Sequence, residues 1–211
     1  MAVYDLEEQE NIDNLKAWWQ QYGRLVIAAA IAFVVGVAGI QGWRHYQGEQ
    51  AIKAATVFAD LEEAVRINDA RHSAELAQKL MADFSGTAYG ARGALLVAKQ
   101  SFDAGKPAAA EAALRWAVAN ARDPQVGALA SLRLGATLME QKKYPEALQA
   151  LSVPHPDAFA ALFADTRGDV FVAQGKLDEA RGAYQVALDK LPKSNAYRNL
   201  VEIKRDALGA K

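Results

Sequence analysis

The stretch GDVFVAQGKLDEARGAYQVALDKLP, residues 168–192, decides the fold of most of the chain. Its apolar residues recur at helical spacing on both sides of a break at Gly175, and Pro192 closes the second segment. Small residues stand at Gly168 and Ala187, where they let two helices approach closely. The stretch therefore predicts a pair of packed helices joined by a short turn.

The same pattern recurs upstream. The preceding unit starts 33 residues before Gly168 and has matching positions at Gly135, Leu138, Tyr144, Ala147 and Leu151. A third, weaker unit has them at Ala98, Gly105, Ala110, Leu114 and Ala117. These offsets resemble the tetratricopeptide repeat, a helical hairpin of about 34 residues. An ordinary bundle of helical hairpins with similar Gly and Ala spacing is the alternative.

Short breaks separate Ala- and Leu-rich helical segments from Gly48 onward. The breaks fall at 68–70, 84–86, 104–107, 122–124, 142–145, 153–156, 175–176 and 191–193. No alternating strand pattern competes, so the prediction is an all-α chain that ends in a solenoid of helical hairpins. Residues 48–84 are expected to form one more helical pair. Residues 194–208 are expected to form a terminal helix with an inward face made of Tyr197, Leu200, Val201 and Leu208.

A second decisive stretch, LVIAAAIAFVVGVAGIQGW, occupies residues 25–43 and contains no charged residue. Nineteen helical residues rise roughly 28 Å, close to the hydrocarbon thickness of a bilayer. Aromatic residues that favour membrane interfaces flank both ends, namely Trp18, Trp19, Tyr22, Trp43 and Tyr46. We predict a single N-terminal transmembrane helix. The alternatives are a buried helix of a soluble protein and a cleaved signal peptide, against which the acidic leader argues.

This division gives three expected regions: a short acidic flank over residues 1–24, the transmembrane helix over 25–43, and the helical repeat domain over 44–211. The flank forms either an amphipathic helix on the membrane surface or a frayed terminus. Two basic residues lie near each end of the span, so the positive-inside rule gives no orientation. Within the span, small residues recur at four-residue spacing and form a candidate face for a partner helix, at Ala28, Ala32 and Gly36.

Composition excludes several classes of function. The 211 residues include 24 basic and 25 acidic side chains, and this near-neutral balance argues against a nucleic-acid partner. The absence of cysteine excludes a thiol nucleophile and a thiolate metal site. The three histidines are scattered, and no catalytic or phosphate-binding motif occurs. We therefore expect no catalytic residues, no metal site and no cofactor, and a protein that is not an enzyme.

A repeat array offers a different resource, the groove along its inner face. Carried onto this chain, the groove positions of tetratricopeptide units are Arg92, Leu95, Lys99, Phe102 and Asp103 in the first unit, Leu129, Leu132, Ala136, Met139 and Glu140 in the second, and Leu162, Asp165, Asp169, Val172 and Ala173 in the third. Apolar residues with flanking charges of both signs suit an extended polypeptide. Each residue taken singly could instead pack in the core.

Five stretches together resemble a known family. They are AWWQQYGR at 17–24, the span, GWRHY at 42–46, AYGA at 88–91, and the run 158–187 with ADTRGD at 164–169. In this order the chain resembles, essentially end to end, the YfgM family of ancillary subunits of the bacterial SecYEG translocon. None of the stretches is a catalytic signature, so the resemblance rests on their order along the chain.

The resemblance implies a single-pass inner-membrane protein with a cytoplasmic N-terminus and a periplasmic repeat domain. It also implies partners: the SecYEG translocon, a membrane-anchored periplasmic chaperone of the PpiD type, and secreted or outer-membrane client polypeptides passed to chaperones. Membrane lipid would surround the span. The alternatives are an envelope scaffold for cell-division or cell-wall assembly complexes, and an enzyme whose site the repeats disguise.

Overall fold

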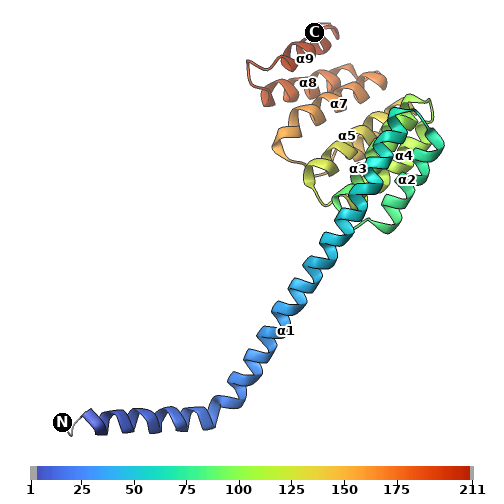
Figure 1. Cartoon of the computed structure of the whole chain (residues 1–211). Coiled ribbons are helices and arrows are strands. Elements are labelled where there is room, and N and C mark those ends of the chain that lie inside the picture. Colours follow the sequence, from blue (N-terminus) through green and yellow to red (C-terminus); the bar gives the residue numbers. More distant parts are fainter. Residues whose placement is uncertain (1–3, 210–211) are drawn as a thin grey trace. The chain divides into compact units, whose positions relative to one another are not determined.

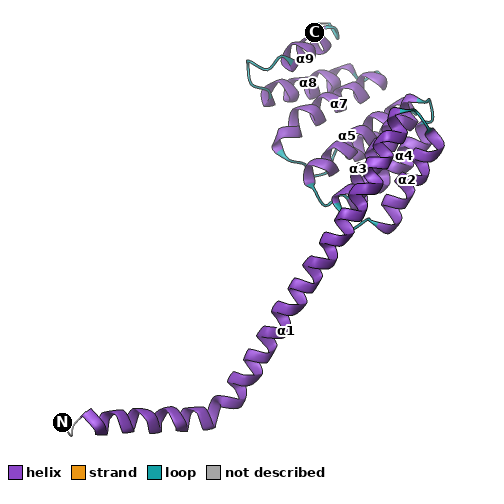
Figure 2. Cartoon of the chain, viewed as in Figure 1, coloured by secondary structure: helices purple, strands orange, loops and turns teal. Residues whose placement is uncertain are grey.

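The computed structural model describes the backbone of residues 4–209 and the side chains of residues 11–209, and this described part contains helices and no strand (Figures 1 and 2). The helices are α1 (Tyr4–Arg66), α2 (Ala70–Asp83), α3 (Ala88–Asp103), α4 (Pro107–Asn120), α5 (Pro124–Glu140), α6 (Tyr144–Ala150), a 3-10 turn at Asp157–Phe159, α7 (Ala160–Ala173), α8 (Leu177–Lys190) and α9 (Tyr197–Asp206). The all-α prediction is confirmed, and the helices end at the expected breaks.

The chain forms two compact units. Residues 1–49, here called the N-terminal segment, are one unit, and residues 50–211, here called the repeat domain, are the other. The predicted boundary at residues 43 and 44 marks a membrane edge and stays a prediction. Packing of the repeat domain begins at Gln50, which lies within α1.

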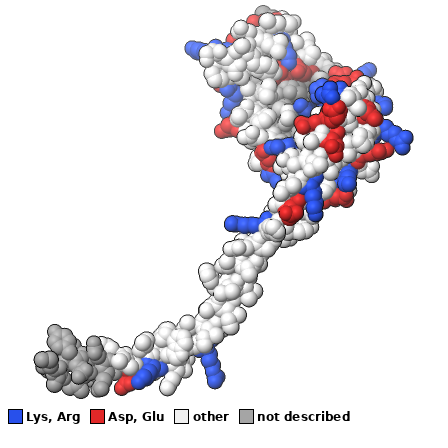
Figure 3. Space-filling view, viewed as in Figure 1, with Lys and Arg blue, Asp and Glu red and all other residues white. Residues whose placement is uncertain are grey.

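The described N-terminal segment is a single helical stretch with an exposed apolar surface. Among the described helices, α1 alone is long and apolar enough to cross a membrane, and none of its apolar window is buried. In Figure 3 the middle of this stretch is uncharged, whereas charged side chains stand toward both of its ends. Aromatic pairs stand at both ends, with ring centroids 5.9 Å apart for Trp18 and Tyr22 and also for Trp43 and Tyr46. These observations fit a membrane span.

The helix axis bends within the blue N-terminal part of α1 (Figure 1). Gly23 lies in this part, and the indole of Trp19 covers it so closely that a Cβ there would be 3.2 Å from the ring. The flank before the span is helical from Tyr4 onward, so its described residues do not form a frayed terminus. Its position on the membrane surface stays a prediction.

In the repeat domain, first and second helices pack in pairs at one recurring contact. Gly135 of α5 lies against Leu151, where a Cβ would be only 2.7 Å from the Leu151 Cγ, and Gly168 of α7 lies still closer to the Tyr184 ring. Both partners stand sixteen residues further along the chain. At the equivalent position of α3 the small residue is Ala98, which is 1% exposed. The predicted repeat positions are therefore the places where paired helices touch.

The turns between paired helices share one geometry. Each has a residue with positive φ, 58° at Asn68, 69° at Gly105, 59° at Lys142 and 75° at Gly175. In all four the next amide donates to the carbonyl five residues earlier at 2.9 Å, as in Asp69 to Ala64. This is the Schellman pattern of helix C-termini. The end of α1 and α2 therefore form a hairpin of the same kind, so the part of the domain that the structure describes contains four: α1 from Gln50 with α2, α3 with α4, α5 with α6, and α7 with α8.

The third hairpin differs from the others because its second helix is short. Helix α6 has 7 residues, whereas α4 and α8 have 14 each. The chain then runs through Pro154, His155 and Pro156, and the imidazole of His155 stacks on Phe163 at 4.0 Å between ring centroids. His155 is thus half-buried by its ring contact and not a free surface histidine.

The terminal helix α9 caps the last hairpin through one face. Val201 is fully buried, and Tyr197 and Leu208 pack around it. The prediction that Leu200 joins this face is wrong, since its side chain is 47% exposed. The inward positions follow 3.6-residue spacing through 197, 201, 204 and 208, so Lys204 occupies the third place and Leu200 points outward.

Candidate binding groove

Three cavities open between successive first helices of the hairpins. One lies between the end of α1 and α3, one between α3 and α5, and one between α5 and α7. Helix α5 contacts both α3 and α7, so the last two cavities are neighbours. Predicted groove residues line all three, including Lys99, Phe102, Ala136, Met139, Asp169 and Val172. We call this row of cavities the groove.

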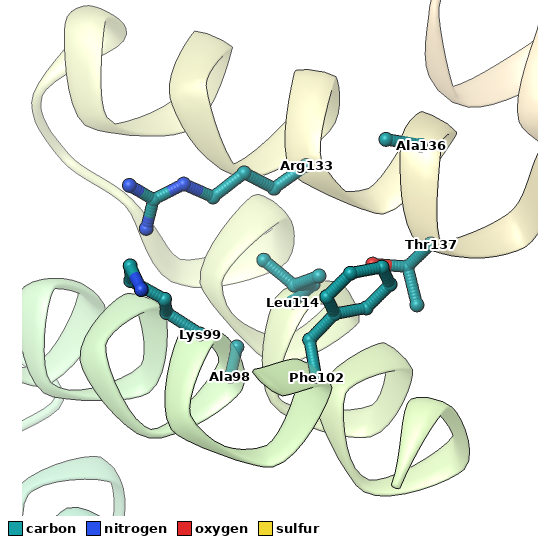
Figure 4. A pocket seen from close by; sticks show the side chains of 7 residues that line it. All are labelled: Ala98, Lys99, Phe102, Leu114, Arg133, Ala136 and Thr137. Atoms are coloured by element: carbon teal, nitrogen blue, oxygen red, sulfur yellow. The ribbon is translucent and has the colours of Figure 1, made fainter. Parts of the chain in front are cut away.

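The α3/α5 cavity has an apolar centre and a basic edge. Its volume is about 180 Å³, and it is lined by Ala98, Lys99, Phe102, Leu114, Arg133, Ala136 and Thr137. Figure 4 shows Phe102 and Leu114 at the centre, while the charged ends of Lys99 and Arg133 converge on one side. The Phe102 ring is 39% exposed, which leaves apolar surface open to a ligand.

The two cations of this cavity differ in how they are held. Lys99 pairs with Asp103 one turn further along α3 at 2.5 Å. Arg133 donates to the Leu95 carbonyl at 3.3 Å, and no carboxylate of the described residues lies within ion-pair distance of it. The guanidinium of Arg133 therefore keeps donors available for an anionic group.

The α5/α7 cavity is larger and more acidic. Its volume is about 370 Å³, and it is lined by Met139, Glu140, Lys142, Tyr144, Asp169, Val172, Ala173 and Tyr184. Val172 is 39% exposed and Met139 is half-buried, so apolar surface is again accessible. Five of the predicted groove positions meet here, two from the last turn of α5 and three from α7, namely Met139, Glu140, Asp169, Val172 and Ala173.

The α1/α3 cavity was missed by sequence reasoning. It has a volume of about 280 Å³ and is lined by Val65, Asn68, Leu96, Lys99, Gln100, Asp103 and Ala104. Val65 stands three residues before Asn68, as Met139 stands three before Lys142. The available signal was the left-handed turn residue, because Asn adopts this conformation more readily than most residues. Reading Asn68 as a left-handed turn residue would have identified the expected helical pair over 48–84 as a further repeat.

Three predicted groove residues are buried, and for them the prediction is wrong. Leu95 is 6% exposed, Leu132 is 9% exposed and Asp165 is 3% exposed. Each stands three residues before the small residue that touches the second helix, so it shares that inward face. Leu95 and Leu132 belong to the main core. Arg92, in contrast, is exposed on α3 but lines none of these three cavities.

Asp165 is instead part of a charge cluster that joins α7 to α9. The Lys204 ammonium lies 2.9 Å from a carboxylate oxygen of Asp165 and 2.9 Å from one of Asp169. The hydroxyl of Tyr197 donates to Asp165 at 2.6 Å, and that of Tyr184 donates to Asp169 at 2.8 Å. A buried carboxylate is tolerated here because every charge has partners.

The cluster shifts the pKa values of its cation and its phenols. Burial tends to lower the pKa of Lys204, but its hydrogen bonds to the two carboxylates outweigh this and raise the pKa. Burial first, and then the hydrogen bond to Asp169, raises the pKa of Tyr184 far above its usual range. Lys204 therefore stays charged at neutral pH and both phenols stay protonated donors.

The membrane-stripe residues are exposed on α1. Ala28, Ala32 and Gly36 face open space in the described chain, and a Cβ at Gly36 would meet nothing within 4 Å. Their role in helix packing stays a prediction. Across the described residues, no group of three or more His, Asp or Glu side chains is placed to hold a metal ion. The described geometry thus offers apolar contact, ion pairs and hydrogen bonds to a ligand in the groove.

Comparisons with known proteins agree with this architecture. A family model described as a tetratricopeptide repeat-like domain matches residues 16–210. No solved structure matches the chain.

Among proteins with similar sequences, an ancillary SecYEG translocon subunit of Neisseria gonorrhoeae is 37% identical over 99% of this chain and 100% of its own length. Proteins of the same description from Haemophilus influenzae and Escherichia coli are 31% and 27% identical, over 88% and 89% of this chain and 90% of their own lengths in both cases. The chain therefore belongs to the YfgM family of ancillary SecYEG translocon subunits with a tetratricopeptide repeat-like domain.

Proposed function

We propose that this protein is a non-enzymatic ancillary subunit of the SecYEG translocon that holds extended segments of secreted polypeptides in its groove and passes them to periplasmic chaperones. The span anchors it in the inner membrane, with the N-terminus in the cytoplasm and the repeat domain in the periplasm. Support for the translocon comes from relatives described as its ancillary subunits. A PpiD-type chaperone is the proposed receiver of the clients.

One observation supports the groove as the binding surface: the cavities recur at the same helix positions in successive hairpins. In every hairpin, the residue three positions before the left-handed turn residue lines one of the cavities. These residues are Val65, Phe102, Met139 and Val172. A recurring row of apolar cavities matches a ligand that is itself a repeating chain. A folded partner would require no such period.

The spacing of the cavities also suits an extended polypeptide. Packed helices lie about 8–10 Å apart, so neighbouring cavities are separated by about that distance. A polyproline II chain rises about 3.1 Å per residue and makes one turn in three residues, so roughly three residues bridge two cavities and every third side chain lies on the same face. The three cavities would therefore hold a segment of about seven to nine residues, with apolar side chains spaced three apart.

Affinity purification of the full chain from solubilised membranes tests the proposal. Translocon subunits and a membrane-anchored chaperone should co-purify, together with pulse-labelled secreted polypeptides. Replacing Phe102 with Glu should lower client recovery several-fold because it puts a charge into the apolar centre of the α3/α5 cavity. Val186→Glu is the matched control, since Val186 is an exposed apolar residue of α8 outside the three cavities.

Two results would contradict the proposal. If neither translocon subunits nor a chaperone co-purify, the protein does not act at the translocon. Equal client recovery with Phe102→Glu and Val186→Glu would show that clients bind another surface. Co-purification with division or cell-wall assembly proteins alone would favour an envelope scaffold instead.

A further inference from the structure

The groove changes the sign of its charge from one cavity to the next. At the α3/α5 cavity, two cations, Lys99 and Arg133, face one carboxylate, that of Asp103. The Asp103 carboxylate already pairs with Lys99. Arg133 is held only by a carbonyl, so its positive charge is available at the edge of the cavity.

The α5/α7 cavity has the opposite balance. Glu140 and Asp169 line it directly, and Asp165 lies behind Asp169 within the cluster around Lys204. These three carboxylates face two ammonium groups, those of Lys142 and Lys204. Glu140 is exposed and makes no ion pair with the described residues, so its negative charge remains available.

A ligand that lies along the groove therefore meets a basic edge and an acidic edge about 8–10 Å apart. This distance corresponds to roughly three residues of a polyproline II chain, in which every third side chain lies on the same face. Each edge adjoins an apolar centre, formed by Phe102 in one cavity and by Met139 and Val172 in the other. A uniformly acidic or uniformly basic segment would be attracted to one edge and repelled by the other.

We propose that the groove selects extended polypeptide segments that carry opposite charges at a defined spacing: an acidic residue beside an apolar residue, then, three positions on from that apolar residue, a second apolar residue beside a basic one. This inference rests on the proposed function and specifies its clients by chemistry. Arg133 receives the acidic side chain, and Glu140 receives the basic one, because Asp169 is already bound by Lys204 and Tyr184. Because a chain can lie in either direction, the opposition of charges and not their order from the N-terminus is what counts.

Four synthetic hexapeptides test this selectivity on the full chain in lipid nanodiscs. The mixed peptide is Asp-Leu-Ser-Gly-Leu-Lys, and the others carry Asp at both ends, Lys at both ends, or Asn and Gln at the ends. Binding is measured by fluorescence anisotropy with a dye on a terminal linker. The mixed peptide should bind about fivefold more tightly than either like-charged peptide at low salt, and the difference should shrink as salt rises.

An Arg133→Gln variant tests whether Arg133 is responsible for the selectivity. It should lose the preference for the mixed peptide over the Lys-ended peptide, because the acidic end no longer has its partner. Lys79→Gln is the control, since Lys79 is an exposed cation of α2 outside the cavities, and it should keep the full preference. Circular dichroism confirms that both variants retain their helices.

The outcomes separate this inference from the proposed function. Equal binding of all four peptides would overturn the charge selectivity and leave the groove as a client site. Absence of binding by every peptide, including the uncharged one, would overturn the groove as a client site and the selectivity with it. A preference that survives in Arg133→Gln would overturn the assignment of the basic edge.

Discussion

The second and fourth hairpins place chemically opposite residues at equivalent positions. Where α3 has Leu95, buried in the core, α7 has Asp165, equally buried but charged. Where α3 has an exposed Lys99, α7 has Asp169, which is bound by Lys204 and Tyr184. The difference shows that the repeat position determines the direction of a side chain, whereas the neighbouring helix determines whether a charged side chain is stable there. Helix α9 supplies the cation that makes a buried carboxylate stable in the fourth hairpin.

The largest expected effect on stability comes from removing the Lys204 ammonium. Lys204→Met leaves Asp165 buried without its counterion, and we expect a loss of about 3–5 kcal/mol in the free energy of unfolding. Urea unfolding of the full chain in detergent, followed by circular dichroism, measures it. The double variant Asp165→Leu with Lys204→Met copies the second hairpin and should recover most of the loss. A double variant as unstable as the single one would show that the ion pair is not the cause.

The contact between paired helices offers a second, smaller test. Gly168→Ala pushes a methyl group into the Tyr184 ring and should cost about 2 kcal/mol through overpacking. The equivalent Ala98 of α3 already carries that methyl group against the second helix. Gly182→Ala on α8 is the control, because a Cβ there meets nothing within 4 Å, and it should be neutral or slightly stabilising. Equal effects at Gly168 and Gly182 would contradict the proposed close contact.

A further charge contact joins the second hairpin to the third and responds to pH. Glu111 accepts from Lys143 at 2.8 Å and from Gln141 at 2.9 Å, and it also pairs with Arg115 at 2.8 Å. The hydrogen bond from Lys143, ahead of the others, holds the pKa of Glu111 at about 2, below its usual value of 4.5. Because the folded pKa is depressed, the stabilisation is present above about pH 4.5 and is lost as the pH falls toward 2.

Glu111→Gln should therefore cost about 1–2 kcal/mol at pH 7 and much less at pH 3. Urea midpoints at the two pH values measure the difference. Glu179→Gln is the control, since Glu179 is exposed on α8, and its effect should be small at both. A cost for Glu111→Gln that does not change with pH would contradict the role of the ionised carboxylate.

The smallest expected effect concerns the turn residues of the third and fourth hairpins. Lys142 and Gly175 occupy the same left-handed position, with φ values of 59° and 75°. Lys142→Gly should stabilise the protein by about 0.5–1 kcal/mol because glycine has no Cβ penalty there. Gly175→Ala should destabilise it by a similar amount. If both substitutions act in the same direction, the two turns are not equivalent.

Much of the fold followed from sequence because helix breaks and small residues report local geometry. Gly135 and Gly168 marked helix contacts correctly, since only a residue without a Cβ fits there. Residues 48–84 were expected to form a helical pair but were not recognised as a repeat, because Asn68 stands where two of the recognised units have Gly105 and Gly175. Its turn geometry depends on backbone conformation, which several residue types can adopt.

The groove was predictable only in part. Positions 99, 102, 139, 169 and 172 line cavities as expected, because they lie on the side of the first helix away from its partner. Asp165 was predicted to line the groove, since charged residues are seldom buried alone. Its partner Lys204 lies 39 residues away along the chain, and no local pattern reveals a contact of that range.

Site-specific photocrosslinking in intact cells tests the central claim, that the groove holds polypeptides in transit, most directly. A photoreactive residue at position 102 or 172 faces a cavity, and one at position 186 is exposed on α8 outside the groove. The account predicts crosslinks to newly synthesised secreted polypeptides from 102 and 172 that disappear when synthesis stops, and few from 186. Equal crosslinking from all three positions, or none from 102 and 172 while secretion proceeds, would contradict it.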